Sequence, residues 1–555
     1  MTVASLIDPD DTPALRKERG AFFTPQNITE FIASWAIRTS DDMVMEPAAG
    51  DAAFLVAAVN RLRDLSQDNT TRPTVDGVEI HAQSAEMARQ RVQDSGGEAR
   101  MCHSDFFAIE SKPIYDTVIG NPPYIRYQDF SGESRTRSRE AALRGGVSLT
   151  GLASSWAAFT VHSAMFLKQG GRLALVLPAE LLSVNYAAPV RRFLFARFRD
   201  VQLVLFDEQV FPEAEADVVL LLADGYLDGP ADHATIRQAK NAEKLASLDV
   251  GLTWKPADPG DKWTSSLVDP KAVKSLDMLL SKGLFTDLET WGDTTLGIVT
   301  GNNKYFTLSP QRVKELGLKS KELLNLSPPG SSHLRGLALS KETLSKLGKD
   351  GQAVYLFYPG DPPSNNAAAY IDDGHRTGVD TAYKCRIRKK WYRVPIVPPA
   401  DLLLTCMNAD TPRLTANGAG AHHLNSVHGV YLNAKYREIG RELLPLASLN
   451  SATLLHAEMV GRAYGGGILK IEPKEADVWA MPSPTLIFES ASSLLAVKEE
   501  VAELLSSGKL MEAVTVVDKI ILTKFSDLST KTIKCIRQAR QDLAQRRTMR
   551  GASGR

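Results

Sequence analysis

Short apolar runs alternate with helical stretches over the first 225 residues, and this alternation constrains the fold more than any other feature of the chain. Such continuous apolar runs are typical of strands that are buried on both faces of a parallel sheet. The runs are residues 44–46, 75–80, 115–119, 172–178, 201–206 and 217–223. The pattern predicts a doubly wound, mostly parallel α/β sheet whose last two strands form an antiparallel hairpin.

The segment Asn121-Pro122-Pro123-Tyr124 directly follows the strand predicted at 115–119. Ligands of open α/β sheets bind beyond the carboxyl ends of the strands. The Asn121 side-chain carbonyl and the Pro122 backbone carbonyl can both accept hydrogen bonds, and Tyr124 can stack on a planar ring. The segment therefore suits a planar group with an exocyclic amine, such as adenine, although four such residues can also form an ordinary proline-rich turn.

Three other strand ends carry groups that suit a second ligand. Residues 46–50 (EPAAG) form a turn of small residues, which lets a ligand approach backbone N–H groups closely. Glu79 ends the next strand, where an acidic residue typically binds ribose hydroxyls; the alternative is a solvated charge. Asp105 could accept a hydrogen bond from an adenine amino group, and Phe106 could stack on the ring. The turn lacks the second glycine of GxGxxG, and we find no GxxxxGK[ST].

The chain resembles the gamma class of DNA adenine-N6 methyltransferases in the order and spacing of five motifs. These motifs are GAFFTP (20–25), EPAAGDAAFL (46–55), VEI (78–80), SDFF (104–107) and NPPY (121–124). The resemblance implies a seven-stranded class I methyltransferase sheet and S-adenosylmethionine as the cofactor. Many relatives carry a glycine where this chain has Ala52, and we expect cofactor binding to survive this small change.

The same resemblance implies roles for individual residues. Thr24 would lie near the methionine carboxylate of the cofactor, and Glu79 would hold its ribose. Glu46, Pro47, Ala48 and Gly50 would lie by the methionine moiety, while Asp105 and Phe106 would hold the adenine ring. Asn121 and Pro122 would grip the target amine, and Tyr124 and Phe211 would stack on the two faces of a flipped-out base. The alternative for Phe211 is a hairpin phenylalanine packed in the core.

The sequence after the first domain divides into three predicted parts. A catalytic domain over 1–225 is followed by an irregular linker over 226–285, an α+β target-recognition domain over 286–490 and a helical, basic segment over 491–555. Cations gather at Lys384, Arg386, Arg388, Lys389, Lys390 and Arg393, which indicates phosphate contacts with DNA; the alternative is a solvated basic strand. Residues 531–555 carry eight Lys or Arg and one Asp, which suits either DNA contact or a frayed tail.

Composition narrows the class of protein. Hydrophobic content of 43% and charged content of 23% are ordinary for a globular protein, and we find neither an apolar run of eighteen residues nor a signal peptide. We therefore expect a cytoplasmic protein that does not enter a membrane. None of the four cysteines forms a CxxC pair or follows a proline, and His422, His423 and His428 lack metal-ligand spacing, so we expect no metal and no cytosine-C5 chemistry.

These features predict a monomeric, site-specific DNA methyltransferase that modifies adenine N6 in double-stranded DNA and protects it from a separate cognate restriction endonuclease. Two alternatives remain. A protein-glutamine N5 methyltransferase also uses NPPY, but it would be a much shorter chain. A bifunctional restriction–modification subunit would need a nuclease domain, and the sequence shows no convincing cluster of paired carboxylates with a nearby lysine.

Overall fold

The computed structural model describes residues 24–66, 72–130, 132–208, 210–211, 218–256 and 258–552. The chain divides after Ser266 into two compact units, called unit 1 and unit 2 below. In the described part of the chain, no helix is long and apolar enough to cross a membrane. The first four residues of the GAFFTP motif lie outside the described residues, whereas Thr24 and Pro25 lie within them.

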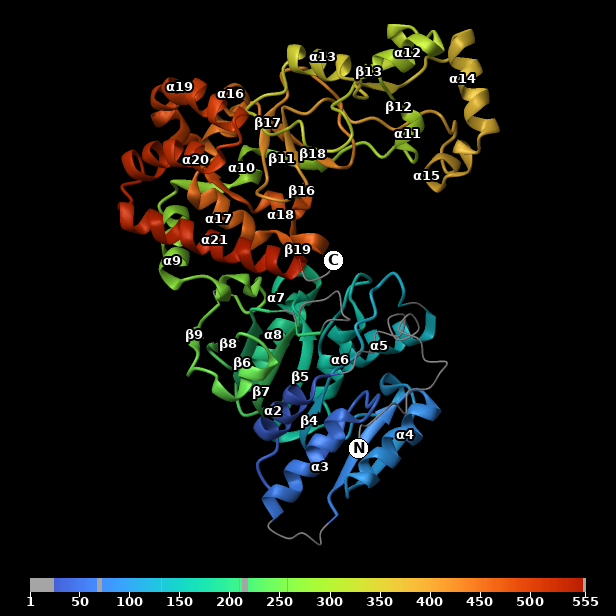
Figure 1. Cartoon of the computed structure of the whole chain (residues 1–555), viewed down its shortest axis with the longest axis vertical. Helices are drawn as coiled ribbons and strands as arrows, with labels where there is room; N and C mark the ends of the chain where they lie inside the picture. The colour runs from blue at the N-terminus through green and yellow to red at the C-terminus, as the bar shows by residue number, and fades with distance from the viewer. Residues whose placement is uncertain are drawn as a thin grey trace. The chain divides into compact units, whose positions relative to one another are not determined.

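Unit 1 is built on a nine-stranded sheet with the order β3-β2-β1-β4-β5-β7-β6-β8-β9 (Figure 1). The strands β1 to β5 pair in parallel, and β7 pairs antiparallel with both β5 and β6. The strands are β1 Val44–Glu46, β2 Thr74–Glu79, β3 Glu98–His103, β4 Tyr115–Gly120, β5 Leu167–Pro178, β6 Phe198–Phe206, β7 Val218–Tyr226, β8 Ala234–Ala239 and β9 Leu252–Trp254. The predicted mostly parallel α/β class is confirmed, including the β6–β7 hairpin.

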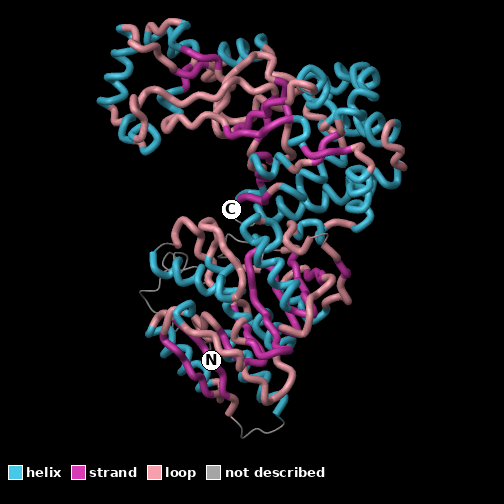
Figure 2. The backbone as a smooth tube through the Cα atoms, turned by 180° about the vertical axis from the view of Figure 1, so that it is seen from behind, coloured by secondary structure: helices cyan, strands magenta, loops and turns pink. Residues whose placement is uncertain are grey.

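Helices cover both faces of this sheet, as Figure 2 shows. The helices α2 (Gln26–Ala36), α3 (Ala53–Ser66) and α4 (Ala82–Asp94) contact one another or the strands β1 to β5 as one group. The helices α5 (Gly132–Arg144), α6 (Ser155–Ala164) and α8 (Ala188–Arg197) form a second group that packs on β5 and β6. Because both faces are covered, the residues of β5 from Gly171 onward are all buried, which is why its sequence is a continuous apolar run.

Two strands of the sheet lie where the sequence predicts an irregular linker. β8 pairs in parallel with β6, and β9 pairs antiparallel with β8, so the sheet has nine strands and not seven. The helix α9 (Pro270–Ser281) also falls within the stretch 226–285. The stretch is polar and rich in Asp and Gly, so its composition did not indicate strands. β9 is an exposed strand at the edge of the sheet, and such a strand needs few apolar residues.

Unit 2 combines small sheets with helices. Its four-stranded sheet has the order β11-β18-β15-β17, and a three-stranded sheet has the order β12-β14-β13. These strands are β11 Gly292–Leu296, β12 Thr307–Leu308, β13 Leu323–Asn325, β14 Tyr355–Phe357, β15 Leu402–Thr405, β17 Leu414–Ala416 and β18 Val427–Leu432. Two smaller pairings join β10 (Phe285–Asp287) to β21 (Ala480–Pro482), and β20 (Ile468–Lys470) to β16 (Met407–Asn408) and β19 (Arg462–Tyr464).

The helical end of the chain agrees with the sequence prediction. It consists of α19 (Pro484–Ser506), α20 (Leu510–Asp518) and α21 (Thr530–Ala552). After α9, the earlier helices of unit 2 are α10 Leu288–Trp291, α11 Asn303–Phe306, α12 Pro310–Leu316, α13 Lys341–Lys349, α14 Asn365–Arg376, α15 Tyr383–Arg386, α16 Arg437–Ala447, α17 Ser451–Val460 and α18 Pro473–Asp477.

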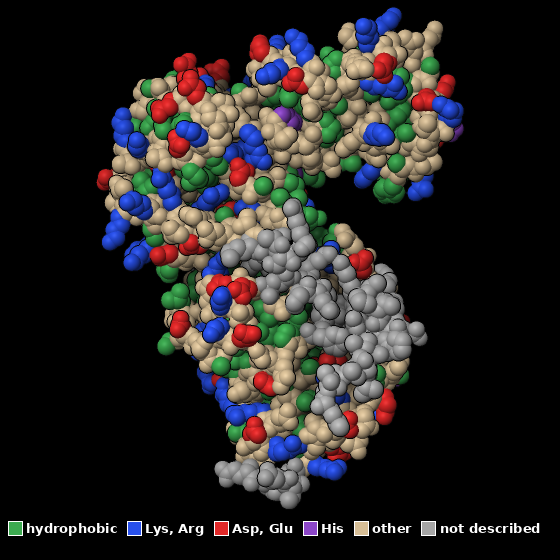
Figure 3. All heavy atoms as spheres, viewed as in Figure 1, with side chains coloured by type: hydrophobic (Ala, Val, Ile, Leu, Met, Phe, Trp, Pro, Cys, Tyr) green, Lys and Arg blue, Asp and Glu red, His purple; other side chains and the backbone are tan. Residues whose placement is uncertain are grey.

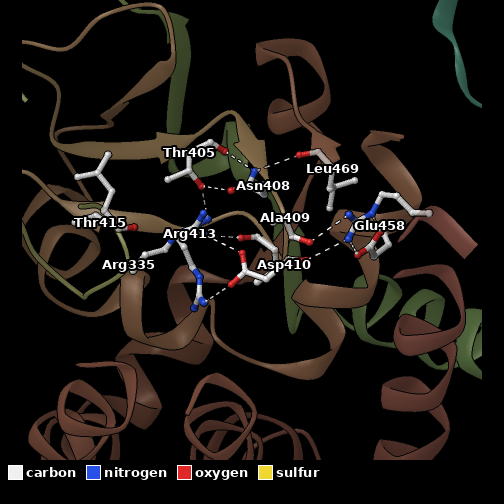
Figure 4. A network of polar contacts seen from close by, with 12 residues as sticks. Arg335, Thr405, Asn408, Ala409, Asp410, Arg413, Thr415, Glu458 and Leu469 are labelled. Carbon is white, nitrogen blue, oxygen red and sulfur yellow. Dashed lines mark hydrogen bonds and ion pairs between the residues drawn. The ribbon is translucent and has the colours of Figure 1, made fainter. Parts of the chain in front are cut away.

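The basic helix α21 is docked onto unit 2 by its cations. Arg547 makes two hydrogen bonds to Glu458 on α17, Nε to Oε2 at 3.0 Å and Nη2 to Oε1 at 2.9 Å, and both side chains are buried. Arg537 pairs with the buried Asp518 at 2.6 Å. Figure 4 shows Glu458 beside the loop that carries Asp410, whose carboxylate lies between Arg335 and Arg413. Arg537 and Arg547 of the segment 531–555 therefore stabilise the fold of unit 2.

Candidate active site

Asn121 lies at the carboxyl end of β4, where the sequence predicts the catalytic group. Its Nδ2 atom donates to Thr24 Oγ1 at 3.2 Å, and its Oδ1 atom accepts from the Tyr124 hydroxyl at 2.6 Å. These two contacts orient the amide so that the carbonyl oxygen faces Tyr124. The structure thus brings together Thr24, Asn121 and Tyr124, although Thr24 precedes Asn121 by 97 residues in the chain.

Tyr124 is held by the sheet as well as by Asn121. Its hydroxyl lies 3.0 Å from the carbonyl oxygen of Val176 on β5. Burial raises the pKa of the Tyr124 hydroxyl well above its usual range, so the group remains a hydrogen-bond donor. The ring packs against the apolar cluster that includes Phe211, which is 4% exposed. Residues 212–217, directly after Phe211, lie outside the described residues.

Ser155 at the start of α6 fastens the segment around Tyr124. Its hydroxyl donates to the Pro123 carbonyl and accepts from the Ile125 N–H at 2.9 Å, and its own N–H donates to the Ile125 carbonyl at 3.1 Å. The residues on both sides of Tyr124 are therefore tied to one buried serine. Ser155 is not among the site residues predicted from the sequence; the available signal was a serine directly before the apolar residues 156–159, as is typical of a helix start.

The turn after β1 has the backbone geometry that small residues permit. Gly50 has φ +50° and Ala52 has φ +64°, a left-handed conformation that costs about 1–2 kcal/mol for a residue with a side chain. Glu79 at the end of β2 accepts from the Gly50 N–H at 2.9 Å through Oε2 and from the His81 N–H at 2.9 Å through Oε1. Pro47 is buried and Ala48 half-buried, so the exposed part of this turn is at Gly50.

Glu46 is a buried carboxylate beside Gly120, the residue before Asn121. Its Oε2 atom is buried and has no hydrogen-bond partner among the described residues. Burial, followed by the nearby charges of Asp51 and Glu79, raises the pKa of Glu46 well above its usual range. A side chain at Gly120 would begin 3.4 Å from Glu46 Cγ, in van der Waals contact, so the ends of β1 and β4 lie close together. An acid in this state favours a cationic ligand.

Asp105 and Phe106 lie together at the end of β3, but the phenyl ring is not where the sequence predicts it. The ring is 3% exposed, with its centroid 5.3 Å from that of Phe159 and 5.4 Å from that of Phe166, both in stacked orientations. The prediction that this ring stacks on a ligand is therefore wrong, because both faces of the ring pack in the core. The backbone N–H of Phe106 begins the short 3-10 helix that Asp105 caps by accepting from the Phe107 N–H at 3.0 Å.

Asp105 also contacts the helix α5. Its Oδ2 atom lies 3.3 Å from Ser134 Oγ and 3.7 Å from Arg137 Nη1. These contacts place α5 beside the end of β3.

The six cations of the stretch 384–393 divide into two groups in unit 2. Arg388 donates to the Val299 carbonyl at 2.8 Å, Lys390 pairs with Asp361, and Arg393 lies 4.4 Å from the ring centroid of Tyr358. The remaining cations are exposed and make no ion pair with any described residue; they are Lys384, Arg386 and Lys389. The stretch forms the short helix α15 and a following turn, so the alternative of a basic strand is wrong.

The three neighbouring histidines His422, His423 and His428 of unit 2 are buried. His423 is 0% exposed, and burial lowers its pKa to about 4, so it stays neutral at physiological pH. His422 and His428 bond to backbone oxygens of Val397 and Ile471. Over the ranges that the structure describes, no group of three or more His, Cys, Asp or Glu side chains is placed to hold a metal ion.

Comparison with known proteins agrees with this arrangement. The family model for N-6 DNA Methylase matches residues 11–226. Residues 11–226 belong to the N-6 DNA methylase family. A second model, the C-terminal domain of the Type II methyltransferase M.Eco57I, matches residues 260–522 of this methylase. The first model covers most of unit 1, and the second begins near the boundary between the units.

Two relatives match this methylase over nearly its whole length. The Type II methyltransferase M.AccI of Acinetobacter calcoaceticus is 24% identical over 92% of this chain and 94% of its own. M.XamI of Xanthomonas campestris pv. amaranthicola is 25% identical over 86% and 87%. The solved structure of the Type IIL restriction–modification enzyme MmeI in complex with DNA has a TM-score of 0.51 at 12% identity, over 93% of this chain and 75% of that chain, which is a likeness of fold.

Proposed function

We propose that this DNA methylase transfers a methyl group from S-adenosylmethionine to N6 of an adenine that is flipped out of double-stranded DNA. The observation that carries the proposal is the position of Asn121 and Tyr124 at the end of β4, next to the turn after β1. In a parallel sheet the ends of neighbouring strands form one crevice, so an amine acceptor and a cofactor turn there would face the same space.

The residues of unit 1 would suit three parts of the cofactor. The unpartnered Oε2 of Glu46 suits the ammonium group of the methionine moiety, because a cation would offset the cost of burying the carboxylate. Asp105 and the Phe106 N–H suit the edge of adenine, since one accepts from the amino group and the other donates to a ring nitrogen. Glu79 suits the ribose hydroxyls. When bound, the cofactor supplies an electrophilic methyl group on a sulfonium.

Asn121 would act on the nucleophile. Its carbonyl oxygen has two lone pairs, so it can accept from the target amine while it keeps the bond from Tyr124. A second hydrogen bond to the Pro122 carbonyl would favour a pyramidal nitrogen with its lone pair directed at the methyl group. Transfer then depends on position and electrostatics more than on a strong base.

Flipping the adenine costs a few kcal/mol. Stacking on Tyr124 would return about 1–3 kcal/mol per base–aromatic contact. Phe211 is 4% exposed in the apolar cluster, so it would have to turn out of that cluster to offer a second face. Unit 2 would supply the target recognition, with Lys384, Arg386 and Lys389 on phosphates. The Type II names of its relatives support a role as the modification enzyme of a system with a separate restriction endonuclease.

The test is transfer of labelled methyl from S-adenosylmethionine to unmethylated genomic DNA, followed by single-molecule sequencing. We expect N6-methyladenine in one defined sequence. Label on a protein glutamine and none on DNA would overturn the proposal.

Asn121→Ala gives the residue-level test. We expect it to bind the cofactor as the wild type does while turnover falls about a hundredfold to a thousandfold, since it removes an oriented acceptor. Asn60→Ala, at an exposed position on α3, is the matched control and should leave turnover unchanged. Normal turnover of Asn121→Ala would contradict the acceptor role.

A further inference from the structure

The helix α15 presents two exposed apolar side chains between exposed cations. Tyr383 is 63% exposed and Ile387 is 59% exposed. They lie four residues apart in helical conformation, so they share one face about one turn apart. We call Tyr383, Lys384, Arg386, Ile387 and Lys389 the α15 patch. Figure 3 shows hydrophobic side chains and Lys or Arg side chains next to one another over the end of unit 2 that carries α15.

The α15 patch lies over a packed apolar core. Cys385, between the exposed residues, is 0% exposed and belongs to an apolar cluster with Tyr305, Phe306 and, at its margin, Trp391. Gly301 has φ +89°, and a side chain there would begin 3.1 Å from both Cys385 Sγ and Lys384 Cβ, so the chain passes close beneath the helix. A face held in this way can bind without first being ordered, which lowers the cost of binding.

Two further contacts fix the helix from its C-terminal side. Arg388 donates to the Val299 carbonyl at 2.8 Å and to the Trp391 carbonyl at 3.3 Å, and its guanidinium lies 5.8 Å from the ring centroid of Phe306. Arg388 therefore serves the fold, and the apolar and charged side chains that remain exposed are those of the α15 patch.

The charge around the patch favours a polyanion. Lys384 lies 5.6 Å from the ring centroid of Tyr383, and no ion pair joins Lys384, Arg386 or Lys389 to a described residue. Of the nearby acids, Asp361 pairs with Lys390, and one carboxylate oxygen of Asp380 lies 2.5 Å from His375 Nδ1. An apolar strip flanked by cations matches a nucleic-acid groove, whose floor is base edges and whose rims are phosphates.

We propose that Tyr383 and Ile387 contact the bases of duplex DNA in a groove, as an apolar wedge, while Lys384, Arg386 and Lys389 bind the phosphates that flank them. The proposal rests on the proposed function, because the duplex is that enzyme's substrate. It adds that this face contacts bases as well as backbone. Apolar side chains inserted in this way unstack a base step and bend the duplex.

The salt dependence of binding separates the two kinds of contact. A cation bound to phosphate releases a counterion, so removing one reduces the slope of log K against log salt by about 1. An apolar contact with a base contributes affinity without counterion release. The binding probe is the duplex that carries the sequence methylated by the wild-type enzyme, in the presence of S-adenosylhomocysteine to prevent turnover.

We expect Tyr383→Ala and Ile387→Ala each to weaken binding about fivefold to a hundredfold with an unchanged salt slope. Arg386→Gln and Lys389→Gln should each reduce the slope by about 1. Phe488→Ala on α19, at a position 57% exposed, is the matched apolar control and should bind as the wild type does. Because all these side chains are exposed, thermal stability should not change.

If both apolar variants bound DNA with wild-type affinity, the proposed contact of Tyr383 and Ile387 with the bases would be wrong. It would also be wrong if Phe488→Ala lost affinity to the same extent. The proposed function is tested separately by methyl transfer of the wild-type enzyme. If the wild type methylates DNA while the apolar variants bind normally, the wedge alone fails; if the wild type transfers no methyl to DNA, both fail.

Discussion

At the scale of one residue, the buried carboxyl of Glu46 lowers the free energy of unfolding of the cofactor-free methylase. Its carboxyl is buried near Asp51 and Glu79, and these surroundings raise its pKa. A group whose pKa is raised on folding contributes stability below its ordinary pKa of 4.5, and this contribution is lost as the pH rises through the higher value in the folded state. At neutral pH, where the carboxyl of the unfolded chain is ionised, burial of Glu46 therefore lowers the stability of the cofactor-free protein.

Glu46→Gln should remove this loss of stability and weaken the binding of S-adenosylmethionine. We expect the variant to have a higher Tm than the wild type at neutral pH, with the difference shrinking as the pH falls toward 4.5. Its affinity for S-adenosylmethionine should fall about tenfold to a hundredfold, because a buried charge-assisted contact is lost. Thermal melts across pH and calorimetric titration measure the two effects. A variant that melts below the wild type at neutral pH would contradict this account.

At the scale of elements, the contact of α6 with the loop after β4 decides where Tyr124 lies. Ser155 bonds to the residues on either side of it, and this one helix start holds the whole segment. Positions near the chemistry are sensitive, since a displacement of about 1 Å can cost a hundredfold in rate.

Ser155→Ala should lower kcat at least about tenfold while the KM for S-adenosylmethionine stays near the wild-type value. Ser155→Thr keeps the hydroxyl and should recover most of the turnover. Ser163→Ala on the same helix is a matched control, because Ser163 is buried and its hydroxyl has no hydrogen-bond partner among the described residues. Equal losses in the Ala variants at 155 and 163 would mean that only helix packing was disturbed.

At the scale of the whole molecule, the two units have separate cores. An apolar cluster in unit 1 draws its residues from Ile28 to Leu245, and one in unit 2 draws them from Val268 to Leu543. Chains with separate cores commonly unfold in more than one transition. The last helix of unit 2, α21, is held to α17 by the buried pair of Arg547 and Glu458.

Arg547→Ala should therefore destabilise unit 2 alone. It leaves Glu458 buried without its partner, which costs about 3–5 kcal/mol. In calorimetry one transition should move to lower temperature, while cofactor binding by unit 1 persists. The control Arg376→Ala breaks an exposed pair with Asp373 and should cost less than about 1 kcal/mol. A uniform shift of all transitions would show that the two units unfold together.

The sequence by itself determined the parallel α/β sheet, the order of its chemical groups and the family. Buried parallel strands need continuous apolar runs, and the groups at their ends follow those runs directly, so both can be read locally. Asn121, Glu46, Asp105 and Glu79 all lie at strand ends in the structure, as the sequence predicts.

The tertiary structure alone decided how side chains are used. The Phe106 ring packs between Phe159 and Phe166, and three of six clustered cations, Arg388 among them, bind within unit 2. β9 joins the sheet although it is a short, mostly exposed strand in a polar stretch of the chain. In each case the deciding contact comes from a residue distant in the chain. The pattern of neighbouring residues therefore does not predict it.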